Sequence, residues 1–352
     1  MTAAMDRTIS FTRSATCRIV VGSGLEAQLR EWLAPHARDG AIVLHDSAVT
    51  SIGDRIGGAI GARATLAIEG GESAKRLAHV GELASRLRDL GVTRRTALVA
   101  VGGGSITDLV GFLAAIYQRG VPCVVCPTTT LAMCDAALGG KNGVDHHGLK
   151  NLLGTIRQPD LLVADVDWLT SLPDAPFREG FVEAVKKAAM LSARDFERLE
   201  VLAPRLVARD GAAIQEAIEL AVRLKLEVVA SDELESDRRR VLNFGHTLGH
   251  ALESASEERI PHGRAVAIGM LLECRVASVD PAIVARLAAL LTALGVDAAL
   301  PGEYADPNRL WHFATQDKKA GGGRVPLLVP AALGQAREVD LDKTSLERAV
   351  RA

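Results

Sequence analysis

Short apolar runs alternate with longer amphipathic stretches over the first half of the chain. The apolar runs have the length and composition of buried strands, which we expect at Arg18–Gly22, Ala41–Leu44, Ala64–Ile68, Ala97–Val101 and Cys123–Cys126. Between them apolar residues recur at helical spacing, which predicts helices over Gly24–Ala37, Val49–Ile60 and Ala74–Leu90. Strands that alternate with helices are typical of a mostly parallel sheet with helices on both faces. The pattern therefore predicts an α/β nucleotide-binding domain.

The pattern changes after about Pro173. Strand-like runs become rare, and long segments rich in Ala, Leu, Glu and Arg show helical spacing, as in Gly211–Ser231 and Pro281–Leu294. We therefore expect an α/β N-terminal domain over residues 1–172 and an all-α C-terminal domain over residues 173–352, with the boundary near Ser171–Ala175.

Length and charge narrow the class of protein. A chain of 352 residues is long enough for two domains, and a formal net charge of -2 gives no overall field that attracts nucleic acid or an anionic membrane. No segment reaches the roughly 20 apolar residues that span a bilayer. The stretch Met1–Arg13 carries Asp6 and lacks the continuous apolar run of a signal peptide. We expect a cytoplasmic protein that binds neither nucleic acid nor membrane.

The 5 cysteines are too few and too scattered for a disulfide framework. Cys123 and Cys126 have the CxxC spacing of a redox or zinc pair, but they lie in the apolar run Val121–Cys126. Small hydrophobic residues of a buried strand are the favoured interpretation.

Two loops follow predicted strands and could contact a cofactor. Gly102, Gly103, Gly104 and Ser105 lie between a strand and the helical stretch Ile106–Ile116, where a glycine-rich turn and a helix N-terminus suit a pyrophosphate. A simple tight turn explains such a run equally well, and the GxGxxG pattern is absent.

Thr128 and Thr129 follow the next strand. Their hydroxyls could contact a cofactor or cap the following helix, and taken alone the cap is favoured.

Histidines cluster in the second half. His246 and His250 lie one helical turn apart on one face, and His262 follows at an expected helix start. Glu183 lies upstream on the amphipathic stretch Gly180–Leu191. Two or three imidazoles and a carboxylate suit Zn²⁺ with one position left for substrate, although spacing alone also allows histidines that are close by chance.

Basic and amide groups surround these histidines in the sequence. Lys141 lies in the glycine loop Leu138–Lys141, where it has no need to solubilise a helix face, so a phosphorylated or carboxylated substrate would explain it. The other groups are Lys150-Asn151, Lys186-Lys187, Lys225, Arg238–Arg240 and Lys318-Lys319.

These residues resemble the 3-dehydroquinate synthase family. Val101–Gly120 looks like the family's GGG…GDL.GF.A..Y.RG segment, and matching blocks follow in family order from about residue 69 to 330. They include Pro127–Thr129, Asp135, Gly139–Lys141, Gly143-Val144, Lys150-Asn151, Glu183…Lys186, Lys225, Asp232-Glu233, Leu242-Asn243, the GHTLGH segment, His262-Gly263 and Asp317–Lys319.

The resemblance implies a dehydroquinate synthase-like fold, a bound NAD, one metal ion and a phosphorylated sugar substrate. The metal implied is usually zinc, with cobalt as the alternative, and its ligands match Glu183, His246 and His262. The cofactor-binding residues implied are Asp46, Glu72, Lys75, Gly102, Gly103, Gly104, Ser105, Asp108, Thr128, Thr129 and Lys150. A homodimer is expected.

The resemblance also assigns substrate-contacting and catalytic roles. Lys141, Asn151, Asn243 and His250 match residues that hold the phosphate. Arg239 falls where dehydroquinate synthases carry an arginine for the substrate carboxylate, which a guanidinium pairs in a bidentate way. The remaining catalytic candidates are Arg119, Asp135, Lys186, Lys225 and Lys318.

Four departures from the family pattern bear on the substrate. Asn142 replaces the usual threonine, Asp145 replaces asparagine, Arg264 replaces glutamate, and Ala175-Pro176 replaces an Arg-Glu pair. The favoured activity is 3-dehydroquinate synthase. A cyclase of the valiolone or deoxy-inosose type is the first alternative, since its substrate lacks a carboxylate, and a glycerol dehydrogenase-like oxidoreductase is the second.

Overall fold

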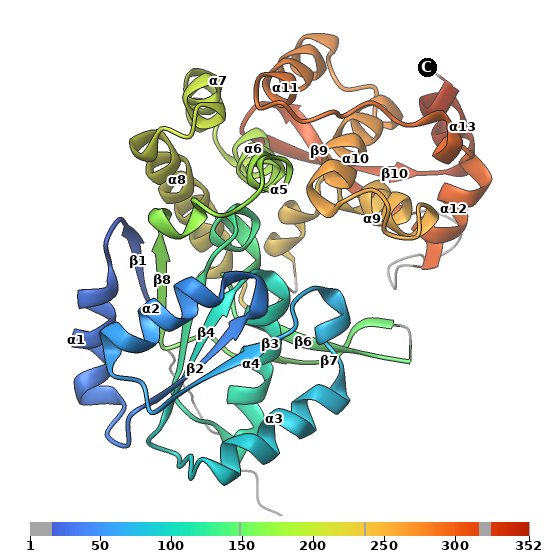
Figure 1. The fold of residues 1–352 in the computed structure, drawn as a ribbon. Helices are drawn as coiled ribbons and strands as arrows, with labels where there is room; N and C mark the ends of the chain where they lie inside the picture. Colours follow the sequence, from blue (N-terminus) through green and yellow to red (C-terminus); the bar gives the residue numbers. More distant parts are fainter. Residues whose placement is uncertain (1–15, 148, 236, 317–324, 352) are drawn as a thin grey trace, which may run out of the picture.

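The computed structural model describes residues 16–147, 149–235, 237–316 and 325–351. A parallel sheet flanked by helices forms the N-terminal part, and a mainly helical part lies beside it (Figure 1). None of the helices within the described ranges is long and apolar enough to cross a membrane.

Six parallel strands form the main sheet in the order β1-β8-β5-β4-β2-β3. They are β1 Arg18–Gly22, β2 Ala41–Asp46, β3 Ala64–Ile68, β4 Ala97–Gly102, β5 Cys123–Pro127 and β8 Leu161–Asp165. The five strands expected from the sequence are present. The sequence analysis missed β8, a short and fully buried strand between β1 and β5.

Helices cover both faces of this sheet, as expected. Helices α1 (Glu26–His36) and α2 (Thr50–Ile60) pack on one face, and α3 (Leu77–Asp89) and α4 (Gly104–Ile116) on the other. Cys126 is buried on the first face and Cys123 on the second, and both are free. The strand interpretation of the CxxC spacing is therefore confirmed.

An antiparallel hairpin projects from the N-terminal part. It consists of β6 (Lys141–His146) and β7 (Leu149–Ile156), and it was not predicted. Most of β7 is exposed, so the run lacks the apolar pattern of a buried strand. A π-helical turn at Ala132–Ala136 precedes the hairpin.

The rest of the chain is mainly helical, as the sequence predicts, with one two-stranded hairpin that it did not. The helices are α5 Asp174–Glu179, α6 Val182–Leu191, α7 Ala193–Val207, α8 Gly211–Val229, α9 His246–Ala255, α10 His262–Val276, α11 Pro281–Ala293, α12 Pro307–Gln316 and α13 Lys343–Arg351. The hairpin pairs β9 (Val325–Ala332) with β10 (Gln335–Leu341). Short 3₁₀ turns occupy Ser47–Val49, Glu72–Ala74, Tyr117–Arg119, Val166–Leu169, Arg238–Asn243 and Gly302–Tyr304.

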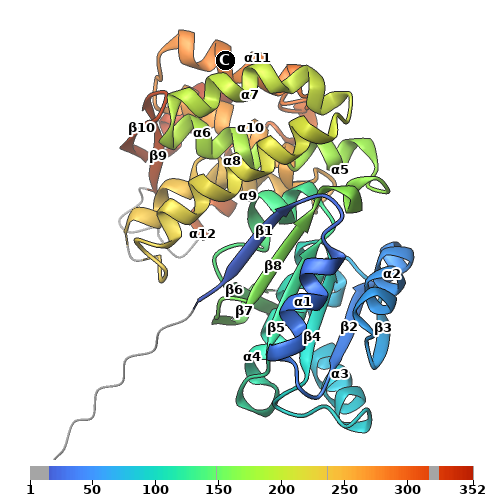
Figure 2. The same cartoon turned by 90° about the vertical axis from the view of Figure 1, so that its left-hand side faces the viewer.

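The two parts share an apolar core that runs from the α3/α4 face of the sheet into the helices. Strand β8 leads upward into the helical part, so the carboxyl ends of the parallel strands face it (Figure 2). Ligands of open α/β sheets bind outside the carboxyl ends of the strands. A ligand-binding site is therefore expected in the region between the two parts.

Candidate active site

Three potential metal ligands come together in the helical part. Glu183 lies in the first turn of α6, and His246 and His262 are the first residues of α9 and α10. One ligand atom from each of the three lies within 4.8 Å of the other two. Lys186 and His246, which are 60 positions apart in the sequence, also meet here.

Both imidazoles turn the same nitrogen toward Glu183. His246 Nε2 and His262 Nε2 lie 3.5 Å and 3.7 Å from Glu183 Oε1. The other nitrogen of each ring has a partner, since His246 Nδ1 donates to the carbonyl of Phe244 and His262 Nδ1 donates to Glu253. Such partners fix the orientation of each ring with Nε2 toward Glu183. Despite burial, Glu183 and Glu253 raise the pKa of His262 to about 10, so a metal bound there would displace a proton from Nε2.

Sequence analysis missed Glu253. Its position on α9, two helical turns after His246, places it on the same helix face, and this was the available signal.

The residues present fit a divalent cation. Glu183 is fully buried, and within the described residues neither of its carboxylate oxygens accepts a hydrogen bond. Lys186 Nζ lies 2.5 Å from Oε2 as an ion pair without hydrogen-bond geometry. Buried carboxylate oxygens normally have partners, and one carboxylate with two imidazoles is a donor set that Zn²⁺ or Co²⁺ takes.

The electrostatics keep one ligand ionised and one neutral. Burial opposes ionisation of Glu183, but the charge of Lys186 outweighs it and the pKa of Glu183 lies below the usual range. Burial, aided by Lys186, holds the pKa of His246 well below that of a free imidazole. A carboxylate and a neutral imidazole are the forms that bind metal.

His250 lies beside this group but is exposed. Its ring centroid is 5.1 Å from that of His246 and 5.9 Å from that of His262. It lines a small cavity of about 50 Å³ together with Arg240, Asn243, His246 and Thr247.

Lysines converge on Asp135. Lys187 Nζ and Lys225 Nζ lie 2.9 Å and 3.0 Å from Asp135 Oδ1, and both lysines are buried. Lys187 also donates to the carbonyl of Cys134. Burial lowers the pKa of Lys225 to about 8, although Asp135 acts in the opposite direction. Sequence analysis gave Lys187 no role, and its place next to Lys186 was the only signal.

Arg239 is buried and bonded to the backbone. Its Nη1 donates to the carbonyls of Gly139 and Glu233 at 3.2 Å and 2.8 Å, and its Nη2 donates to Gly139 at 3.3 Å. The guanidinium therefore supports the glycine loop that carries Lys141. Arg240, rather than Arg239, lines the cavity beside His250.

Glu235 joins two of the expected phosphate ligands. It forms an ion pair with Lys141, and Asn243 Nδ2 donates to its Oε1 at 3.3 Å. Sequence analysis missed this residue, because an acidic residue in a polar loop carries no distinctive pattern. It adopts a left-handed conformation with φ 57°.

The expected cofactor segments meet at the carboxyl edge of the sheet. Asp46, Gly102 and Thr128 end or follow the neighbouring strands β2, β4 and β5. From β2 the chain continues to β3 on one side of the sheet, and from β4 it continues to β5 on the other side, so the strand order reverses between β2 and β4. Dinucleotides bind at such a point in open α/β sheets.

The glycine run forms the start of α4. Gly103 is the N-cap of α4, and a Cβ added at Gly102 would lie 2.8 Å from Cβ of Ile106. Ser105 lies in the first turn of the helix. Thr129 Oγ1 accepts the N–H of Ala132, so this hydroxyl does act as a cap.

Lys75 connects three of the other expected residues. Its buried ammonium lies 3.0 Å from Asp108, 3.3 Å from Glu72 and 2.6 Å from Asn151 Oδ1. Asp108, Lys141 and Asn151 line one cavity of about 420 Å³. Asn151 thus lies between the expected cofactor and phosphate groups.

Lys150 pairs with Glu258 of the helical part at 2.6 Å. Arg119 is exposed beyond the C-terminal end of α4, and the structure does not bring it to this site within the chain. Lys318 lies outside the described residues.

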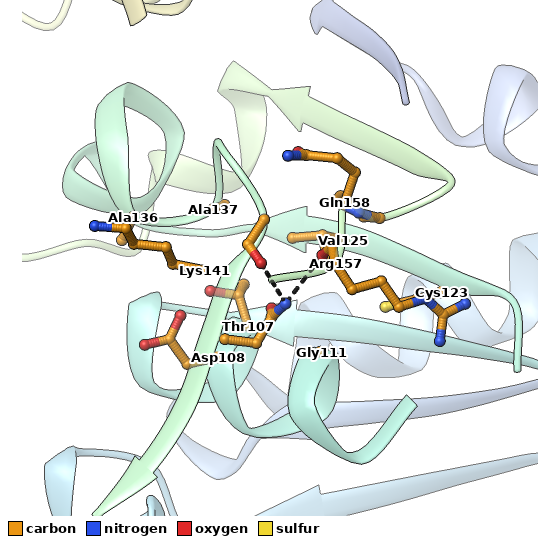
Figure 3. A pocket seen from close by; sticks show the side chains of 13 residues that line it. Thr107, Asp108, Gly111, Cys123, Val125, Ala136, Ala137, Lys141, Arg157 and Gln158 are labelled. Atoms are coloured by element: carbon orange, nitrogen blue, oxygen red, sulfur yellow. Dashed lines mark hydrogen bonds between the residues drawn. The ribbon is translucent and has the colours of Figure 1, made fainter. Parts of the chain in front are cut away.

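Three of the departures have local structural partners. Asn142 Nδ2 donates to the carbonyls of Gly140 and Arg157, in a narrow cavity beside Thr107, Asp108 and Lys141 (Figure 3). Asp145 accepts the N–H of Asn151, which has φ 51°.

Arg264 turns away from Asp145 and pairs with Asp297 at 2.5 Å. The opposite charges of Asp145 and Arg264 therefore do not form a pair.

Solved structures share this fold over nearly the whole chain. A 2-deoxy-scyllo-inosose synthase, complexed with carbaglucose-6-phosphate, NAD⁺ and Co²⁺, is 27% identical with TM-score 0.87, covering 95% of this chain and 96% of its own. A 2-epi-5-epi-valiolone synthase from Streptomyces hygroscopicus, with NAD⁺ and Zn²⁺ bound, is 28% identical with TM-score 0.88, covering 98% of both chains. The chain thus has the fold of the sugar phosphate cyclases.

Sequence comparison assigns the family. Residues 65–179 match the N-terminal domain of 3-dehydroquinate synthase and residues 180–320 match its C-terminal domain. The 3-dehydroquinate synthase of Symbiobacterium thermophilum is 37% identical, over 90% of this chain and 92% of its own. That of Pyrobaculum neutrophilum is 39% identical, over 82% of this chain and 84% of its own. The chain belongs to the 3-dehydroquinate synthase family.

Proposed function

We propose that this protein is an NAD- and zinc-dependent 3-dehydroquinate synthase. It would convert 3-deoxy-arabino-heptulosonate 7-phosphate to 3-dehydroquinate and inorganic phosphate, a carbon–oxygen lyase reaction of the shikimate pathway to aromatic amino acids. The observation that carries the proposal is the group of Glu183, His246 and His262 next to converging cations, in a chain of this family.

When bound, Zn²⁺ would supply a Lewis acid for the substrate hydroxyls and NAD⁺ would supply a reversible hydride acceptor. Glu183, His246 and His262 would hold the metal, and the turn at Gly102–Gly104 would hold the dinucleotide. Lys75, which follows the 3₁₀ turn Glu72–Ala74, and Asp108 on α4 would contact the cofactor.

The chain's own polar groups would bind and orient the substrate. Lys141, Asn243 and His250 lie where they could hold a phosphate, because Lys141 and Asn243 share Glu235 and Asn243 shares a cavity with His250. Removal of a hydride from one substrate alcohol would give a ketone, which makes the neighbouring C–H bond more acidic. During elimination that carbon loses its proton and the C–O bond to the phosphate breaks. His250 is the exposed imidazole placed to take or pass on that proton.

The cations argue against a simple dehydrogenase. Lys186, Lys187 and Lys225 are buried beside the metal group, and Lys141 opens on a cavity. Glu183, Asp135 and Glu235 pair with these four lysines and leave one positive charge over, which a polyol cannot balance and a phosphorylated substrate can.

One observation supports a second candidate, a cyclase for a substrate without a carboxylate. Arg239, the expected carboxylate ligand, already donates three hydrogen bonds to backbone carbonyls. A guanidinium has five N–H donors, so some remain for a carboxylate, and the dehydroquinate synthase assignment keeps its preference.

The decisive experiment measures phosphate release with NAD⁺ and Zn²⁺. We expect turnover of the heptulosonate phosphate and little with sedoheptulose 7-phosphate or glucose 6-phosphate, without net formation of NADH. Preference for either carboxylate-free sugar would favour the second candidate. NADH formed in proportion to turnover, without phosphate release, would contradict any cyclase.

We also propose a cytoplasmic homodimer. Exposed Leu149, Leu152 and Ile156 lie on β7, where a second copy could cover them. Light scattering of the purified protein tests the dimer, and a monomer at micromolar concentration would contradict it.

A further inference from the structure

Glu273 is an acidic residue of the helical part that has no role in the proposed chemistry. It lies on α10, three helical turns after His262, and is fully buried. Its Oε2 accepts the N–H of Gly245 at 2.7 Å and its Oε1 accepts the N–H of Leu248 at 3.1 Å. Both amides belong to the start of α9, whose first residue is the expected ligand His246.

Helix α9 has no cap of its own. The first amides of any helix lack partners within the helix, and a Ser, Thr, Asp or Asn side chain at the N-cap usually accepts one of them. The N-cap of α9 is Gly245, which has no side chain. Glu273 supplies the missing acceptor from the neighbouring helix, since its two carboxyl oxygens accept the N–H groups of Gly245 and Leu248.

The two helices are also in close backbone contact. Gly245 has φ 77°, and a Cβ added at Gly269 would lie 2.1 Å from the carbonyl oxygen of Gly245. A Cβ added at Gly249 would lie 3.1 Å from the carbonyl oxygen of Ala265. Because no side chains separate the two backbones, α9 and α10 are packed in close contact. A shift of α9 along α10 would also break the two hydrogen bonds to Glu273.

We propose that Glu273 is a positioning residue for the metal site. It fixes the first turn of α9 and thereby holds His246 Nε2 at its distance from Glu183 and His262. Glu253 acts in the reverse direction, since it lies on α9 and receives a hydrogen bond from His262 on α10. Each helix of the pair thus orients the ligand that the other carries.

The inference rests on the metal binding proposed above, and the test is metal affinity. Glu273→Gln keeps the size of the side chain but replaces one acceptor by an NH₂ group that faces an N–H. We expect its dissociation constant for Zn²⁺, measured by competition with a chromophoric chelator, to rise by about 10- to 100-fold. The visible spectrum of the Co²⁺-substituted protein should change, because His246 would shift in the coordination sphere.

Asp280→Asn is the matched control. Asp280 caps α11 by accepting the N–H of Ala282 at 2.8 Å, and α11 carries no expected ligand. This variant should lower the melting temperature and leave the Zn²⁺ affinity and the Co²⁺ spectrum unchanged. If Glu273→Gln does not fold, Glu273→Asp keeps the carboxyl group on a shorter arm and should still raise the dissociation constant at least threefold.

Two results would overturn the inference in different ways. Wild-type affinity and spectrum in Glu273→Gln, or in Glu273→Asp, would show that the acid only supports the fold. A wild-type protein that binds neither Zn²⁺ nor Co²⁺ would instead remove the metal site of the proposed function.

Discussion

Asp135 holds Lys225 twice, through its carboxylate at 3.0 Å and through its own backbone carbonyl at 2.7 Å. Lys187 binds the same carboxylate, so two buried ammonium groups share one acid. Burial, aided by the neighbouring charge of Lys187, favours loss of the proton of Lys225, although Asp135 opposes it.

The burial of Lys225 predicts how the stability of the protein depends on pH. Burial lowers the pKa of Lys225 to about 8 in the folded protein, from 10.5 in the unfolded chain. Between these values the unfolded chain binds more protons, so the contribution of Lys225 to the free energy of unfolding rises with pH. The free energy of unfolding of the wild type minus that of Lys225→Met should rise by about 1 kcal/mol per pH unit between pH 8 and 10.5. Urea unfolding at several pH values measures it, and a flat difference would refute the assigned pKa.

The second prediction concerns Arg239. Lysine cannot reproduce the guanidinium fork that reaches the carbonyls of Gly139 and Glu233. Arg239→Lys should therefore lower kcat/KM for the heptulosonate phosphate, by a factor that corresponds to about 2–4 kcal/mol of lost transition-state stabilisation. Arg238→Lys is the control, because Arg238 lies in the same 3₁₀ turn and is exposed, and the variant retains a charge. It should change kcat/KM by less than about threefold.

The carboxylate-free sugars separate two explanations of an Arg239 effect. Loss of activity on the heptulosonate phosphate alone indicates contact with the carboxylate. Equal loss on every sugar that the wild type accepts would show that Arg239 acts only by supporting the glycine loop at Gly139.

The third prediction concerns the cofactor. Lys75→Met removes the ammonium that binds Asp108 and Asn151, leaving two polar groups without a partner. We expect the dissociation constant for NAD⁺ to rise about tenfold or more, and stability to fall by about 1–3 kcal/mol. Isothermal titration and urea unfolding measure the two effects.

Arg76→Met tests whether the effect is specific to Lys75. Arg76 is the exposed neighbour of Lys75 and donates to the carbonyl of Ser73 at 2.6 Å. It should bind NAD⁺ as the wild type does. Equal weakening in both variants would mean that the whole 3₁₀ turn, rather than Lys75, governs binding.

The fourth prediction concerns the metal content. The wild type should carry about one zinc ion per chain by elemental analysis, and chelation should abolish activity, which added zinc restores. Glu183→Gln and His262→Ala should each lose the metal. His312→Ala, on α12, should keep it. Full activity of the wild type after complete metal removal would contradict the site.

The periodicity of the sequence was enough to predict the parallel sheet and most helices, because buried strands and amphipathic helices carry strong local patterns. It was not enough for β7, whose exposed surface carries no such pattern, or for β8, a short run that becomes a strand only between β1 and β5. The β9–β10 hairpin was missed because helical segments dominate its surroundings.

The expected metal ligands could be named because the family motif contains them. Glu235, Glu253 and Glu273 could not, because each acts through a contact with a residue that only packing brings near. The contact of Arg239 with Gly139 likewise joins residues 100 positions apart, and no local pattern predicts it.

The β6–β7 hairpin reaches the helical part through charges of unequal exposure. The side chains of Lys150 and Glu258 are 48% and 57% exposed, and that of Lys141 is 52% exposed, whereas that of Lys187 is 0% exposed. At about 1 M salt the screening length falls to about 3 Å, which weakens exposed pairs and leaves buried ones nearly intact. High salt should therefore weaken the exposed ion pairs of Lys141 and Lys150 and leave the buried pair of Lys187 with Asp135 intact. We expect salt to speed the exchange of ligands between the hairpin and the helical part before it lowers the stability of the fold.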